Sequence, residues 1–70
     1  MLSELLTPHW IESEMRRNGY SDASLARTVG VTSKAVEFWR TGHRRVGAGN
    51  MEALLGAFGY ELEVHRVAGE

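Results

Sequence analysis

The stretch SDASLARTVGVTSKAVEFWRTG, residues 21–42, predicts two short helices joined by a glycine turn. In its first half, Ser21 is a typical N-cap residue, and Leu25 and Val29 recur at the spacing of one helix face. Gly30 ends this helix, because glycine adopts the left-handed conformation past a helix terminus without a steric penalty. We expect the rest of the chain to hold this pair of helices in place.

The second helix of the stretch is predicted to lie between Thr32, as its N-cap, and Gly42, as its stop. An advance of about 100° per residue places Val36 and Trp39 on one side, which we expect to be buried. The other side carries charged, polar and apolar residues together: Lys34, Glu37, Phe38 and Thr41, with Ser33 toward the edge. An exposed large apolar residue such as Phe38 is more informative than a buried one, and we interpret this side as a recognition surface.

The core and turn positions of the stretch are Leu25, Ala26, Gly30, Val31, Thr32, Val36, Trp39 and Gly42. In type and spacing they resemble the helix-turn-helix of the phage repressor and Cro family, also called XRE-type, over about residues 7–59. The resemblance implies an all-α, lambda-repressor-like domain whose recognition helix, at about residues 33–40, lies in the DNA major groove. It also implies a dimeric transcriptional repressor that binds an inverted-repeat operator, including that of its own gene.

The same resemblance implies which residues contact DNA. Base contacts are expected from the start and outer face of the recognition helix, at Ser33, Lys34, Glu37 and Phe38. Phosphate contacts are expected from the helix caps, the helix end and the following loop, at Ser21, Thr32, Thr41, His43, Arg44 and Arg45. Two alternatives stay open: Lys34 and Glu37 can be only a local surface pair, and Phe38 can pack on a partner subunit.

Two flanking helices complete the predicted domain. The first runs over residues 8–18, with Thr7 as N-cap, and the last runs from Ala48 or Asn50 to Phe58. The predicted core comprises Ile11, Met15, Leu25, Val29, Val36 and Trp39, covered by Met51, Leu54 and Phe58.

One position departs from the resembled family. Many of its members pair an arginine of the first helix with a glutamate just before the last glycine of the motif, whereas this chain has Met15 and Arg40 there. We expect either a sign-reversed pair between Glu14 and Arg40 or an Arg40 that lies in solvent or on a phosphate.

The end of the chain alternates apolar and polar residues from Tyr60 to His65, which is the period of a strand. A lone strand has no partner within the chain, so residues 60–67 are predicted to pair with the same segment of a second copy. The predicted dimer interface comprises Tyr60, Leu62 and Val64. The alternative is an extended tail that packs on its own domain.

The length, cysteine content and charge distribution of the chain limit the functions that it can have. Seventy residues allow one domain, 1–70, and the lack of cysteine is compatible with a reducing cytoplasm. The net charge is −1, but residues 27–45 carry a net +4 while residues 1–26 and 46–70 carry −2 and −3. Because distant charges are screened, a basic middle is typical of a one-sided phosphate-binding surface.

No catalytic motif or metal-ligand spacing is present, so we expect neither an enzyme nor a metal or other cofactor. The first six residues are too short and too acidic for a signal peptide, and no long apolar segment indicates a membrane partner. The predicted setting is the cytoplasm, with double-stranded DNA as partner and a phage or mobile element as origin. The alternatives are an antitoxin that also holds a toxin protein, and a protein-interaction module on the same fold.

Overall fold

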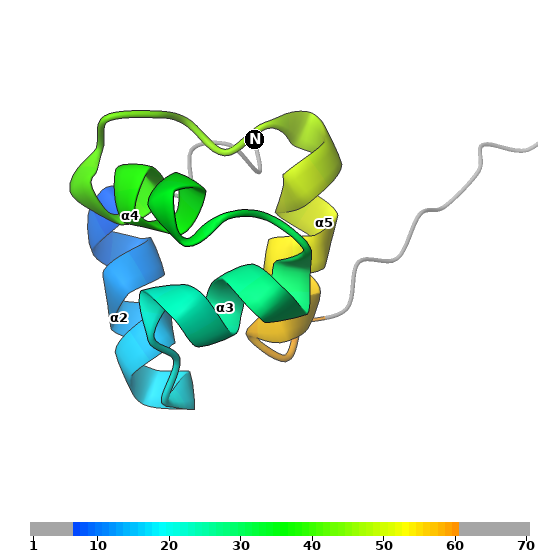
Figure 1. The fold of residues 1–70 in the computed structure, drawn as a ribbon. Coiled ribbons are helices and arrows are strands. Elements are labelled where there is room, and N and C mark those ends of the chain that lie inside the picture. The colour runs from blue at the N-terminus through cyan, green and yellow to red at the C-terminus, as the bar shows by residue number, and fades with distance from the viewer. Residues whose placement is uncertain (1–6, 61–70) are drawn as a thin grey trace, which may run out of the picture.

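The computed structural model describes residues 7–60, and these form four α-helices. They are α2 (Pro8–Asn18), α3 (Asp22–Val29), α4 (Ser33–Thr41) and α5 (Ala48–Ala57). In Figure 1, α3 crosses below α4, α2 and α5 stand on either side, and residues 42–47 run over to α5. The four predicted helices and the all-α class are therefore confirmed for this part of the chain. The predicted strand lies outside the described residues, except for Tyr60.

The helix ends are built by the predicted caps. The hydroxyls of Thr7, Ser21 and Thr32 each accept a backbone N–H of the first turn that follows, at 3.1–3.2 Å. Ser24 completes a capping box with Ser21, because the Ser24 hydroxyl oxygen accepts the Ser21 backbone N–H at 2.9 Å. Gly30 has φ 89°, a left-handed conformation that strains other residues, so the α3–α4 turn depends on glycine at this position.

The core lies between the four helices. Its buried apolar residues are Ile11, Met15, Leu25, Ala26, Val36, Trp39, Val46, Leu54, Leu55 and Phe58. Val29 and Met51, which we expected in the core, are only partly buried and pack against it. Val46 is an addition from the loop after α4, and its burial fixes that loop to the core.

An aromatic group covers the α2–α5 side of the core. The Trp10 ring meets the Phe58 ring edge-on at 5.7 Å and lies 5.9 Å from the Tyr60 ring. The Tyr20 hydroxyl donates to the Ala57 carbonyl at 3.0 Å. These contacts join the end of α5 to α2. They involve no residue of α4.

Candidate nucleic-acid interface

The outer side of α4 gathers three nitrogen-bearing side chains around one aromatic ring. Lys34 Nζ lies 5.4 Å and Arg44 Cζ 5.5 Å from the centroid of the Phe38 ring. The His43 ring lies 5.7 Å from it, at 35°. We call these four residues, Lys34, Phe38, His43 and Arg44, the Phe38 surface. The distances are those of cation–π contacts, which hold flexible cationic side chains near a fixed ring.

Phe38 itself differs from our expectation of an exposed ring, because it is half-buried. The three neighbouring side chains cover part of it, and this contact was not visible in the helix period alone. Phe38 thus organises the charged groups around it, and only part of its ring is free to contact a ligand.

The backbone after α4 brings the loop back onto the helix. Gly42 adopts φ 86°, and the N–H groups of His43 and Arg44 both donate to the Phe38 carbonyl, at 2.9 and 3.2 Å. The buried side chain of Val46 holds the other end of the loop. The end of α4 and the loop after it therefore lie on the same surface as Lys34, which belongs to the first turn of α4.

Three residues of α4 that were predicted to contact DNA also form polar contacts within the chain: Lys34, Glu37 and Thr41. The Thr41 hydroxyl donates to the Glu37 carbonyl at 2.8 Å, and its oxygen lies 2.8 Å from His43 Nδ1. Lys34 Nζ lies 3.5 Å from Glu37 Oε1, so the local surface pair is present. The Lys34 side chain is 66% exposed and that of Glu37 is 43% exposed, and ion pairs at the surface contribute only about 0–1 kcal/mol. The pair therefore leaves Lys34 and Glu37 free to exchange partners.

The structure places the predicted DNA-contacting residues in three groups. The first comprises the four residues of the Phe38 surface, together with Glu37 and Thr41, which contact Lys34 and His43. Ser21 and Thr32 lie at the starts of α3 and α4, where their hydroxyls cap the helices. Ser33 and Arg45 are exposed. Leu62 and Val64, predicted for the dimer interface, lie outside the described residues.

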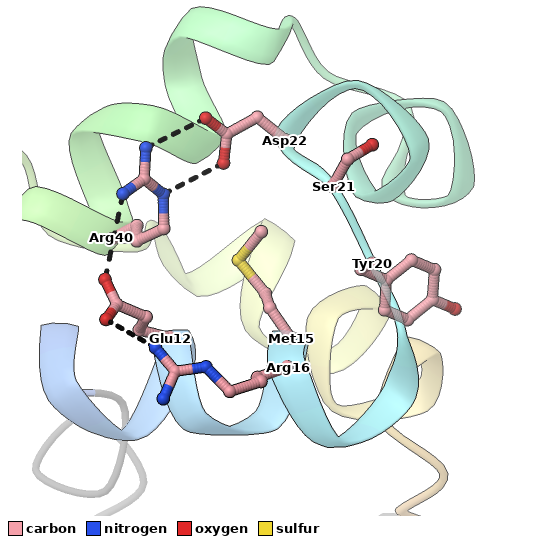
Figure 2. Close-up of a pocket in the computed structure, with 7 residues that line it drawn as sticks. All are labelled: Glu12, Met15, Arg16, Tyr20, Ser21, Asp22 and Arg40. Carbon is pink, nitrogen blue, oxygen red and sulfur yellow. Dashed lines mark hydrogen bonds and ion pairs between the residues drawn. The ribbon is translucent and has the colours of Figure 1, made fainter.

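Arg40 does not pair with Glu14, so that prediction is wrong. Its guanidinium donates from Nε and Nη2 to the two oxygens of Asp22, at 3.0 and 2.9 Å, and Nη1 lies 3.7 Å from Glu12. Figure 2 shows Arg40 between these two carboxylates. The three residues line a surface hollow of about 430 Å³, and Met15 is also part of its lining. The Asp22 carboxylate raises the pKa of Arg40, so this arginine stays charged and its pairing joins α2, α3 and α4.

The geometry of α2 explains the error. Glu12 and Glu14 are two residues apart, which places them about 200° apart around the helix. Glu12 faces α4, whereas Glu14 is 8% exposed and binds Arg17 at 2.6 Å and the Tyr60 hydroxyl at 3.1 Å. No local pattern in the sequence joins Asp22 to a residue 18 positions later. Because Arg40 is paired, the positive charge of this region is smaller than the residue count indicated.

Tyr60 contacts α2 of its own chain. The residue is 43% exposed, and its hydroxyl and ring contact Glu14 and Trp10 of α2. The hydrogen bond from Arg17 lowers the pKa of Glu14, burial opposes this, and the Tyr60 hydroxyl lowers the pKa further.

This shift makes stability depend on pH. A carboxyl whose pKa is lowered by folding stabilises the fold above its unfolded pKa, and this contribution is lost as the pH falls through the folded pKa. We expect the free energy of unfolding of Glu14→Gln to fall less between about pH 5 and pH 3 than that of the unchanged protein, as measured by urea denaturation. Glu52→Gln, at an exposed position of α5, serves as the control. Equal pH dependence in Glu14→Gln and the unchanged protein would contradict the assignment.

Comparisons of the chain with protein-family models, with curated proteins and with solved structures find no match. The resemblance to the repressor family rests on the residue pattern alone. Within residues 7–60, no helix is long and apolar enough to cross a membrane. In the same part of the chain, no three His, Cys, Asp or Glu side chains are grouped so that they could hold a metal ion.

Proposed function

We propose that this chain is a sequence-specific, double-stranded-DNA-binding transcriptional regulator, in which α3 and α4 form a helix-turn-helix. The observation that carries the proposal is the division of α4 into two sides. One side is buried through Val36 and Trp39, at 0% and 3% exposure, and the other presents the Phe38 surface. A helix that is anchored on one side and presents cations on the other is suited to bind a polyanion.

The dimensions of α4 fit the major groove of DNA. Its nine residues span about 14 Å, and a helix of ordinary diameter enters the groove, which is about 12 Å wide. Lys34 lies in the first turn, where a recognition helix contacts base edges, and can donate to guanine O6 and N7. Glu37 can accept from cytosine N4, and the free part of the Phe38 ring can contact a thymine methyl group.

The loop after α4 is suited to the DNA backbone. Arg44 is held near Phe38, while Arg45 is exposed beside it. Arginine forms charge-assisted hydrogen bonds with phosphate and carries no base preference there. The negative net charge does not oppose this function, because charges more than about 8–10 Å away are largely screened at physiological salt.

A dimer completes the proposal. One helix-turn-helix contacts only a few base pairs, and repressors of this size place two recognition helices about 34 Å apart across a two-fold axis. The segment 60–67 is proposed to pair with its copy, as an antiparallel strand. Tyr60, the first residue of that segment, contacts α2 of its own chain. Such a dimer binds an inverted repeat and represses by occupying a promoter.

The experiment that tests phosphate binding is the salt dependence of affinity for duplex DNA. Arg44→Ala should weaken binding to every sequence and lower the slope of log affinity against log salt by about one. Arg16→Ala removes the same charge from α2, where the side chain is 79% exposed and paired with Glu12, and should leave the slope unchanged. An unchanged slope in Arg44→Ala would show that this arginine faces away from DNA.

A further inference from the structure

The contacts of Thr41 determine which nitrogen of His43 carries a proton. The hydroxyl of Thr41 has one hydrogen, and this hydrogen is donated to the Glu37 carbonyl. The Thr41 oxygen can then only accept at its other contact, 2.8 Å from His43 Nδ1. With the hydroxyl hydrogen on the Glu37 carbonyl, we assign a hydrogen to Nδ1 of His43. In the neutral ring, Nε2 is left with a lone pair and no hydrogen.

A neutral ring in this tautomer cannot bind a phosphate. The ring is exposed, and both its Nε2 atom and a phosphate oxygen are acceptors. The contact forms only if Nε2 gains a proton. We propose that His43 binds a DNA phosphate as the imidazolium, with Thr41 as its positioning residue, so that DNA binding takes up one proton at Nε2. The inference rests on the proposed function and adds a pH dependence to it.

Charged groups of α4 and of the following loop lie around the Phe38 ring that His43 contacts. Lys34 of α4 and Arg44 of the loop lie over this ring, and the Glu37 carboxylate pairs with Lys34. On the side of α2, the uncharged residue Pro8 lies against Gly42, which precedes His43. The titratable residue next to Pro8 in the sequence is His9. A bound phosphate supplies the negative charge that the imidazolium lacks in the free protein.

The first test is the affinity for a rhodamine-labelled 20-base-pair duplex at constant salt, measured by anisotropy from pH 8 to pH 6. Phosphodiesters do not titrate in this range, whereas histidine does. We expect log affinity to rise as the pH falls, with a slope that approaches one, about ten-fold per pH unit. His43→Gln should bind with no such rise, because its amide N–H donates at every pH. The control His9→Gln should keep the rise.

The second test is the tautomer in the free protein, determined from long-range ¹H–¹⁵N correlations of His43 above pH 8. The proposal requires hydrogen on Nδ1. Thr41→Val removes the acceptor and should reduce the pH dependence of binding, since Nε2–H then becomes available in the neutral ring.

The outcomes separate the two proposals. An Nε2–H tautomer in the unchanged protein, or a pH rise that persists in His43→Gln, would overturn the inference while DNA binding stands. No binding to duplex DNA at any pH would overturn the proposed function, and the inference with it.

Discussion

Trp39→Ala is expected to destabilise the domain by about 3–5 kcal/mol, the usual cost of removing a buried tryptophan or phenylalanine. Trp39 is 3% exposed and holds α4 against the core, so its loss leaves a cavity where α4 meets α2 and α3. A domain of 70 residues has a total stability of about 4–10 kcal/mol. We therefore expect a largely reduced or lost unfolding transition in urea.

The neighbouring aromatic residue is a matched control. Phe38→Ala removes a ring from the same turn of α4, but that ring is half-buried and its partners are exposed cations. Its loss should reduce stability by much less, since each exposed cation–π contact is worth about 0.5–1 kcal/mol. Equal stability losses at the two positions would contradict the assignment of a buried and an outer side to α4.

Lys34→Ala is expected to reduce affinity for the preferred DNA site by about 1–3 kcal/mol, or roughly 5-fold to 150-fold, and for random DNA much less. The reason is that a lysine in the first turn of the recognition helix donates to a base edge and so discriminates between sequences. Its side chain is 66% exposed and its pair with Glu37 is weak, so the fold should keep its stability.

Arg27→Ala is the control for this variant, because it removes one positive charge from an exposed position of α3, outside the Phe38 surface. Any loss of affinity in Arg27→Ala should be equal for the preferred DNA site and for random DNA. If Lys34→Ala also weakened both DNAs equally, Lys34 would be assigned to the phosphate backbone instead of the bases.

The parts of the fold that could be predicted are those governed by local physics. Caps act within three residues, as between Thr32 and Ala35, and a left-handed glycine such as Gly30 ends a helix regardless of what packs around it. The helix period also separated the buried Val36 and Trp39 from Lys34 and Glu37. These rules were sufficient to predict where the helices begin and end, and which side of α4 is buried.

The parts that could not be predicted depend on contacts between distant segments. Arg40 binds Asp22 rather than Glu14 because the packing of α3 on α4 brings the start of one helix to the end of the other. Phe38 is half-buried because Gly42 and Val46 fold the loop back over it. No spacing within one helix encodes either contact, or the 2.8 Å approach of Thr41 Oγ1 to His43 Nδ1 beyond the helix end.

Selection of bound sequences from random duplex DNA by purified protein of residues 1–70 tests whether α4 recognises a specific sequence. We expect enrichment of an inverted repeat whose half-sites have centres about 10–10.5 base pairs apart, one helical turn. The Lys34→Ala variant should select the same repeat with relaxed preference at one base pair in each half-site. Binding without enrichment of any sequence would contradict specific recognition by α4, and an absence of binding would favour the protein-interaction module.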